Sequence, residues 1–134
     1  MKMNAAEILA FLAVEFPAAS RFGNLISVTD DCVVIELPHD DANIRPGGTI
    51  SGPTMMALAD TTAYYLVLAM CGPLALAVTS NLNINFLRRP RPGTLTATAR
   101  TLKLGRRLVI VEVDITDATA ALLAKATVTY ALPG

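Results

Sequence analysis

A single carboxylate interrupts the most apolar segment of the chain. Residues 53–71 contain Asp60 and no other acidic residue, and they contain no Lys, Arg or His. Because burying an isolated carboxylate costs free energy, such a group must accept hydrogen bonds, take up a proton or face a wet cleft. A structural role, in which Asp60 bonds a backbone amide or a side chain across the fold, is the alternative. We favour a functional role, in which Asp60 acts as a base or nucleophile.

A predicted helix start lies two turns before Asp60. Ser51 or Gly52 can cap a helix that runs from Gly52 to Cys71, Pro53 suits its first turn, and a Gly-Pro pair ends it. First-turn amides favour negative charge, so the Gly52 N–H can polarise a carbonyl as an oxyanion hole does. The two groups are about 12 Å apart along the axis. A substrate lying across the helix start reaches both only if side chains leave a channel.

The segments around this helix predict one α+β domain over residues 1–134. Residues 4–16 have helical spacing, two strands are expected within 24–37, and 38–51 reads as a loop. Strand-like segments follow the long helix at 76–86, 94–104, 108–116 and 121–132. This order predicts an antiparallel sheet curled round one central helix.

Two patterns predict which faces are buried. The long helix is apolar on nearly every side, which predicts burial all round. In 76–86 the even positions are expected to face the core. The odd positions include Asn81, Asn83 and Asn85, which share the other face and line a subunit interface or meet water.

The bulk composition excludes several classes of function. The 134 residues carry 11 basic and 11 acidic side chains, so the formal net charge is zero. That balance argues against electrostatic binding to nucleic acid or to an anionic membrane. The longest uninterrupted apolar run is too short to span a bilayer. Apolar residues make up 53% of the chain, and the excess indicates extra buried surface, as in an obligate oligomer.

The Cys and His content excludes further chemistry. Cys32 and Cys71 form no CxxC pair, and His39 is the only histidine, so neither a zinc site nor a Ser-His-Asp triad is expected. His39 reads as a solvated loop residue. The cysteines read as reduced packing residues of a cytoplasmic protein, and the N-terminus lacks the features of a signal peptide.

Two motifs carry a resemblance to a known family. Residues 45–53, Arg-Pro-Gly-Gly-Thr-Ile-Ser-Gly-Pro, followed by Leu58-Ala59-Asp60, resemble the PaaI-like branch of the hotdog thioesterases, related to 4-hydroxybenzoyl-CoA thioesterase. That branch typically reads Asn-Pro-x-Gly-x-Val-His-Gly-Gly and then Leu-x-Asp/Glu. Residues 81–88 and 105–107 resemble its next strand and hairpin, so the resemblance covers about residues 20–132.

The resemblance implies a fold, an activity and a site. It implies a hotdog fold and hydrolysis of an acyl-CoA thioester, aryl or medium-chain, without a cofactor. It makes Asp60 the catalytic carboxylate and assigns the carbonyl-polarising N–H to Gly52. It also places the site at the interface of a homodimer, which can pair into a tetramer, so that residues of the second subunit complete it.

Three residues depart from the family pattern. Arg45 replaces the usual Asn, Ser51 replaces His, and Pro53 replaces the second Gly and removes one N–H. Arg45 binds a substrate carboxylate or phosphate, pairs with Asp60, or is a solvated cation. These losses favour, as the alternative function, a non-catalytic acyl-CoA-binding module. An enoyl-CoA hydratase is a third hypothesis, weakened because His39 is far from the helix start.

Several polar side chains are further candidates for substrate binding. Arginine suits phosphate because its donors form a planar fork, so the turn arginines are candidates for contacts with CoA phosphates, although charged turns are also commonly just solvated. Tyr64, one turn beyond Asp60, shapes the acyl pocket or belongs to the core. The full set of candidates is Arg45, Ser51, Tyr64, Asn81, Arg88, Arg89, Arg91, Arg106 and Arg107.

Overall fold

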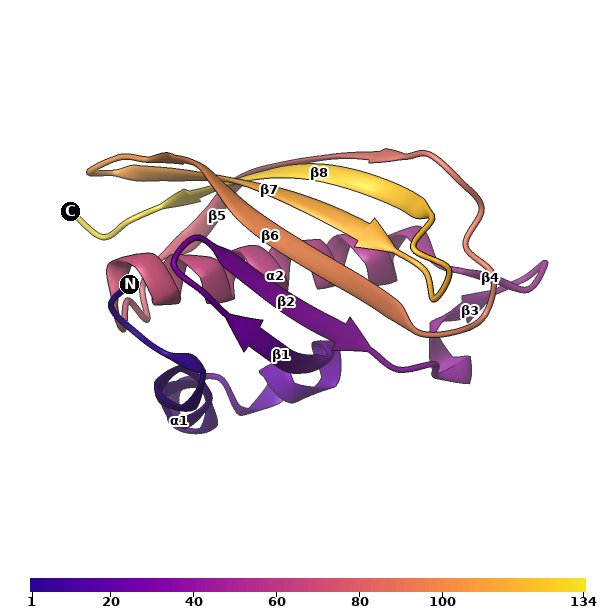
Figure 1. Ribbon diagram of the computed structural model, residues 1–134, viewed down its shortest axis with the longest axis horizontal. Coiled ribbons are helices and arrows are strands. Elements are labelled where there is room, and N and C mark those ends of the chain that lie inside the picture. Colours follow the sequence, from indigo (N-terminus) through magenta and orange to yellow (C-terminus); the bar gives the residue numbers. More distant parts are fainter.

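The computed structural model describes residues 1–134 and contains one long helix, one short helix and one large sheet (Figure 1). The helices are α1 (Ala5–Glu15) and α2 (Gly52–Cys71), with two 3-10 turns, η1 (Pro17–Phe22) and η2 (Asp41–Asn43). The strands are β1 (Asn24–Val28), β2 (Cys32–Leu37), β3 (Ile44–Arg45), β4 (Thr49–Ile50), β5 (Val78–Phe86), β6 (Leu95–Leu104), β7 (Leu108–Thr116) and β8 (Leu122–Ala131).

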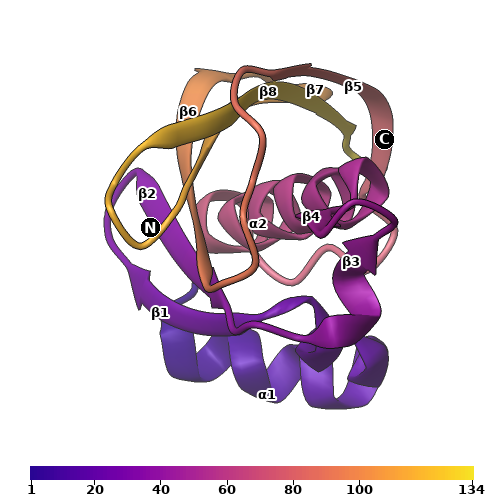
Figure 2. The same cartoon turned by 90° about the vertical axis from the view of Figure 1, so that its right-hand side faces the viewer.

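Six strands form an antiparallel sheet in the order β1-β2-β6-β7-β8-β5, and this sheet curls around α2 (Figure 2). The predicted α+β arrangement, a sheet wrapped round one central helix, is therefore confirmed. The long helix has the predicted bounds, and the predicted strands lie within two residues of those observed. The predicted loop 38–51 differs, because it contains η2 and the small β3–β4 hairpin.

The sheet buries one side of α2 and leaves a stripe of the other side uncovered. Leu58, Leu66 and Leu68 are at most 1% exposed, whereas Met56 is 40% exposed. Pro53 is also exposed, and Asp60 and Tyr64 are half-buried. The prediction of burial all round is thus wrong for the isolated chain. A curled sheet contacts only part of a cylinder, so covering the remaining apolar stripe needs a further element.

α2 is also the one helix long and apolar enough to cross a membrane by length and composition. In its most apolar window, however, 56% of the residues are buried inside the fold. That burial is typical of the core helix of a globular domain.

A bulge changes which side chains of β5 face the helix. β5 pairs with β8 in register except between Thr79 and Asn81, where Ser80 is the extra residue. Beyond the bulge the even residues Leu82 and Ile84 are half-buried, as predicted. Before it the pattern is reversed, since Val78 is 58% exposed and Thr79 reaches Asp60 on the helix. The predicted core face for all even positions is therefore wrong on one side of the bulge.

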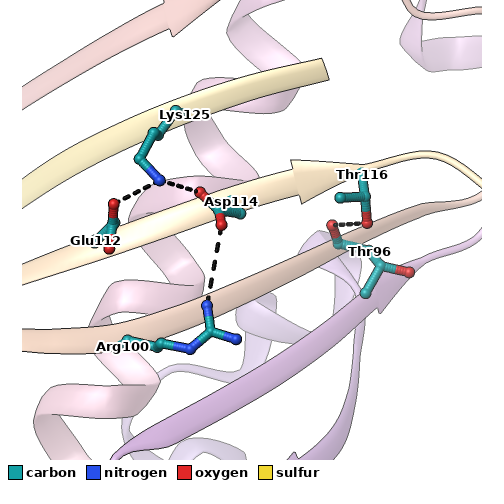
Figure 3. Close-up of polar contacts among 6 residues, drawn as sticks. All are labelled: Thr96, Arg100, Glu112, Asp114, Thr116 and Lys125. Atoms are coloured by element: carbon teal, nitrogen blue, oxygen red, sulfur yellow. Dashed lines mark hydrogen bonds and ion pairs between the residues drawn. The ribbon is translucent and has the colours of Figure 1, made fainter. Parts of the chain in front are cut away.

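The outward face of the sheet carries a network of charged side chains (Figure 3). The Lys125 ammonium on β8 lies 2.5 Å from Glu112 Oε1 and 2.9 Å from Asp114 Oδ1, both on β7. Arg100 on β6 lies 4.0 Å from the other oxygen of Asp114. The hydrogen bonds to Glu112 and Asp114 raise the pKa of Lys125. Because these pairs are largely solvated, they favour the strand register more than they add stability.

We predict that the buried side of α2 dominates stability. Leu66→Ala removes a side chain that is 0% exposed and should lower the free energy of unfolding by about 2–5 kcal/mol, because the cavity cannot fully collapse. Urea denaturation measures the change. Leu76→Ala is the matched control, since Leu76 is 76% exposed and its truncation should change stability by less than about 0.5 kcal/mol. Equal losses in the two variants would contradict the observed packing.

Candidate active site

Asp60 accepts two short hydrogen bonds from the sheet. Thr79 Oγ1 on β5 and Tyr130 Oη on β8 each donate to Asp60 Oδ1 at 2.7 Å. Thr79 and Tyr130 are direct partners across the β5–β8 ladder, so adjacent strands present both hydroxyls to the helix at the same level. The carboxylate is thus satisfied by side-chain hydroxyls, and no backbone amide donates to it.

Sequence reasoning did not single out either donor. Thr79 lies on the odd face that the alternation assigned away from the core, and only the bulge at Ser80 turns it inward. Tyr130 lies in the last strand, 70 residues away from Asp60 along the chain. The signal for Tyr130 was a phenol placed in a core-facing position, because a buried tyrosine hydroxyl needs a hydrogen-bond partner.

Two tyrosine rings support this arrangement. Tyr64, one turn beyond Asp60, stacks on Tyr130 with ring centroids 5.7 Å apart and an interplanar angle of 21°. The Tyr64 hydroxyl donates to the backbone oxygen of Leu74 at 3.4 Å. Burial raises the pKa of Tyr130, and the nearby Asp60 carboxylate raises it further. The Tyr130 hydroxyl therefore keeps its proton at neutral pH and remains a hydrogen-bond donor.

A crevice of about 360 Å³ opens beside these side chains. The crevice is lined by Thr79, Tyr130, Tyr64 and Phe16, among others. Both donors to Asp60 thus border space that solvent can enter, and Asp60 itself is half-buried. A half-solvated carboxylate with fixed donors fits a reactive group better than a sealed structural acid.

The start of α2 is built by residues that depart from the family pattern. Ser51 is the N-cap, and its hydroxyl accepts from the Thr54 amide at 3.2 Å. Thr54 Oγ1 lies 2.7 Å from the same hydroxyl and donates to Asn43 Oδ1 at 3.3 Å. The Ser51 amide donates to the Asn43 carbonyl at 2.9 Å. Ser51 and Asn43 therefore fix the helix start, on which the orientation of the Gly52 amide depends.

Gly52 and three candidate arginines, Arg45, Arg88 and Arg89, border one open pocket of about 420 Å³ at the helix start. Arg45 comes from the β3–β4 hairpin, and Arg88 follows β5. A side chain at position 52 would place its Cβ 3.5 Å from the Phe86 ring, so glycine leaves the amide approachable rather than relieving a clash. Arg45 makes no ion pair within the chain, so it does not pair with the Asp60 of its own subunit.

The other candidates lie elsewhere. Arg106 and Arg107 are in the β6–β7 turn, at the end of the sheet away from the β3–β4 hairpin (Figure 1). They are therefore not brought together with Arg45 and Arg88 within one chain. Asn81 is exposed on the edge strand β5, past the bulge that turns Thr79 inward.

The expectations for His39 and the cysteines are met. His39 is a half-exposed residue of the segment after β2, and its Nε2 lies 2.9 Å from Asp41 Oδ1. Cys32 and Cys71 are free thiols, and burial raises the pKa of Cys71. The Cys71 thiol is therefore not activated as a nucleophile would be.

Comparison with known proteins identifies the family. Residues 47–124 match the family described as "Thioesterase superfamily". A putative thioesterase from Silicibacter superposes with a TM-score of 0.89 at 36% identity, over 98% of this chain and 93% of that one. A putative thioesterase from Ralstonia eutropha, described as phenylacetic acid degradation-related, gives 0.81 at 27% identity, over 93% and 98%. A hypothetical thioesterase protein from Streptococcus pneumoniae, solved with coenzyme A, gives a TM-score of 0.81 at 23% identity, over 95% of this chain and 97% of that one, which shows the shared fold.

The chain belongs to the thioesterase superfamily, and the predicted resemblance to PaaI-like hotdog thioesterases is confirmed. It is a thioester hydrolase with a hotdog fold, in which the antiparallel sheet surrounds the central helix α2.

We predict that Ser51 contributes mainly through capping. Ser51→Ala removes the side-chain acceptor of the Thr54 amide and should lower the free energy of unfolding by about 1 kcal/mol. Ser51→Asn is the control, because asparagine caps about as well as serine and should retain stability. Thermal unfolding compares the two. A stable Ser51→Ala variant would show that the cap is dispensable.

Proposed function

We propose that the protein hydrolyses acyl-CoA thioesters, with Asp60 as the acid–base group and the Gly52 N–H as the carbonyl-polarising donor. In the main route Asp60 takes a proton from a water, the water oxygen adds to the thioester carbon, and the C–S bond breaks. The proton then passes to the departing CoA thiolate. Direct attack by the carboxylate is the alternative route. The observation that carries the proposal is the half-buried Asp60, held by two hydroxyls beside an open crevice.

The distance between the two catalytic groups favours a site shared by two subunits. Asp60 lies eight positions after Gly52 along the helix, which corresponds to a rise of about 12 Å. A donor to the carbonyl oxygen and a base acting through one water each work at about 3 Å, so both cannot serve one thioester easily within a single helix. If two helices pack antiparallel, Gly52 of one subunit faces Asp60 of the other. The exposed stripe of α2 and the open edge of β5 support this homodimer.

The pockets around the helix start suggest how the substrate lies. Arg45, Arg88 and Arg89 border the pocket at Gly52 and suit the phosphates of CoA. A pocket of about 600 Å³ lies beside the first turns of α2 and is lined by Ala57, Leu58, Phe22, Leu37 and Pro38 among others. Its size and mixed lining fit an aryl or medium-length acyl group.

A catalytically inactive acyl-CoA-binding protein is the second candidate. It is favoured by one observation, the replacement of the family's Asn and His by Arg45 and by Ser51, whose hydroxyl is engaged in capping the helix. Tight binding of an acyl-CoA without turnover would support it. The two free thiols favour a reducing, cytoplasmic location for either function.

We predict that hydrolysis depends on the Asp60 carboxylate. Asp60→Asn keeps the shape of the side chain and an acceptor for Thr79 and Tyr130, but removes the base, so kcat should fall about 100-fold or more. The assay follows thiol release from a panel of aryl and medium-chain acyl-CoAs. Asp31→Asn, in the exposed β1–β2 turn, is the matched control and should be fully active. Equal activity of Asp60→Asn and the wild type would reject the proposed role.

We predict that two inactive variants restore activity together. In a dimer that joins Asp60→Asn with Gly52→Val, one site keeps Asp60 and an unobstructed Gly52 amide, whereas the other lacks the carboxylate and has its amide obstructed by the valine side chain. After unfolding and refolding of an equal mixture, half of the dimers are mixed, so about one quarter of wild-type activity should return. Each variant refolded alone is the control. No recovery, with mixed dimers demonstrated by mass spectrometry, would mean that each site belongs to one subunit.

A further inference from the structure

The two oxygens of Asp60 have different surroundings. Oδ1 accepts from both Thr79 and Tyr130 at 2.7 Å, whereas no group of the chain donates to Oδ2. A free carboxylate can rotate and exchange its oxygens, but one with two fixed donors on the same oxygen is held in a single orientation. The sheet therefore distinguishes a held oxygen from a free one.

Of the two donors, Tyr130 is the more rigidly fixed. It is 5% exposed, pairs with β5 on one side and β7 on the other near the end of β8, and stacks on Tyr64. Its hydroxyl is also 3.2 Å from the Asp60 backbone oxygen, which keeps it over this turn of the helix. Thr79 is exposed and lies on the edge strand beside the bulge. The position of Oδ1 thus depends chiefly on the phenol.

We infer that Tyr130 is a positioning residue of the active site: together with Thr79 it holds Asp60 Oδ1, so that Oδ2 is the oxygen that takes the proton from the hydrolytic water. This inference rests on the proposed function and deepens it. Tyr130 touches neither the water nor the thioester, and it acts only through Asp60. The water gives one proton to Oδ2 and its oxygen bonds to the carbonyl carbon, and the proton leaves Oδ2 when the thiolate departs, so Tyr130 keeps its own proton throughout.

Tyr130→Phe tests the inference, because it retains the ring and its stack on Tyr64 and removes only the hydroxyl. We expect kcat to fall about 10- to 100-fold, since misplacing a catalytic group has effects of this size, while KM changes by less than about 2-fold. Tyr65→Phe is the matched control. Tyr65 follows Tyr64 on α2, is 2% exposed and makes no hydrogen bond to Asp60. The Tyr65→Phe variant should therefore keep the wild-type kcat.

A double mutant separates positioning from a merely structural role. If Tyr130 acts only through Asp60, adding Tyr130→Phe to Asp60→Asn should not lower the residual rate further, whereas a general loss of structure would lower both rates. Should Tyr130→Phe be too unstable to assay, Thr79→Val removes the other donor to Oδ1 and should show the same loss of kcat and the same non-additivity.

The outcomes separate this inference from the function on which it rests. A wild-type kcat in Tyr130→Phe, or additive losses in the double mutant, overturns the positioning role while an inactive Asp60→Asn leaves the hydrolase proposal intact. An active Asp60→Asn, or a wild-type protein that cleaves no acyl-CoA, overturns the proposed function and the inference together.

Discussion

The hydrogen bonds of Asp60 join the central helix to β8 and β5, the two strands at one edge of the sheet. Without donors, a carboxylate on this apolar helix would cost free energy, and two hydroxyls on adjacent strands offset that cost. The arrangement requires β5 and β8 to pair so that Thr79 and Tyr130 lie opposite each other, and it requires the bulge at Ser80 to turn Thr79 inward. The hydrogen bonding of Asp60 therefore depends on the register of β5 and β8.

The second constraint is that the sheet covers only part of α2. The leucines on one side of the helix form the core with the sheet, while the stripe with Met56 and Asp60 meets solvent in the isolated chain. An uncovered apolar stripe beside an open strand edge favours association with a second copy. The same association would bring Gly52 within reach of an Asp60 that lies about two turns too far away on its own helix.

The start of α2 depends on its N-cap and on the contacts of that cap. Ser51 stands where the family usually has His, yet it caps the helix and is linked to Asn43 through Thr54 and through its own amide. Because a backbone N–H polarises the carbonyl in the proposed mechanism, a well-capped first turn matters more than the side chain that caps it. The arginines around this turn add positive charge where an anionic substrate would enter.

Local sequence patterns are enough to predict the helices, the strands and the candidate acid. The Gly-Pro pair predicts the end of α2, and the alternation of apolar residues predicts the strands. Asp60 stands out in the sequence as the only acidic residue of an apolar segment. The motif around Gly52 and Asp60 also identified the family, which the comparisons confirm. The residues that contact Asp60 follow only from the tertiary structure. A one-residue bulge reverses the inward face of a strand, and the Tyr130 that meets Asp60 is 70 residues distant, so neither contact follows from local spacing. The uncovered stripe of α2 was missed for the same reason, because the width of helix that a sheet can cover depends on how far the whole sheet curls.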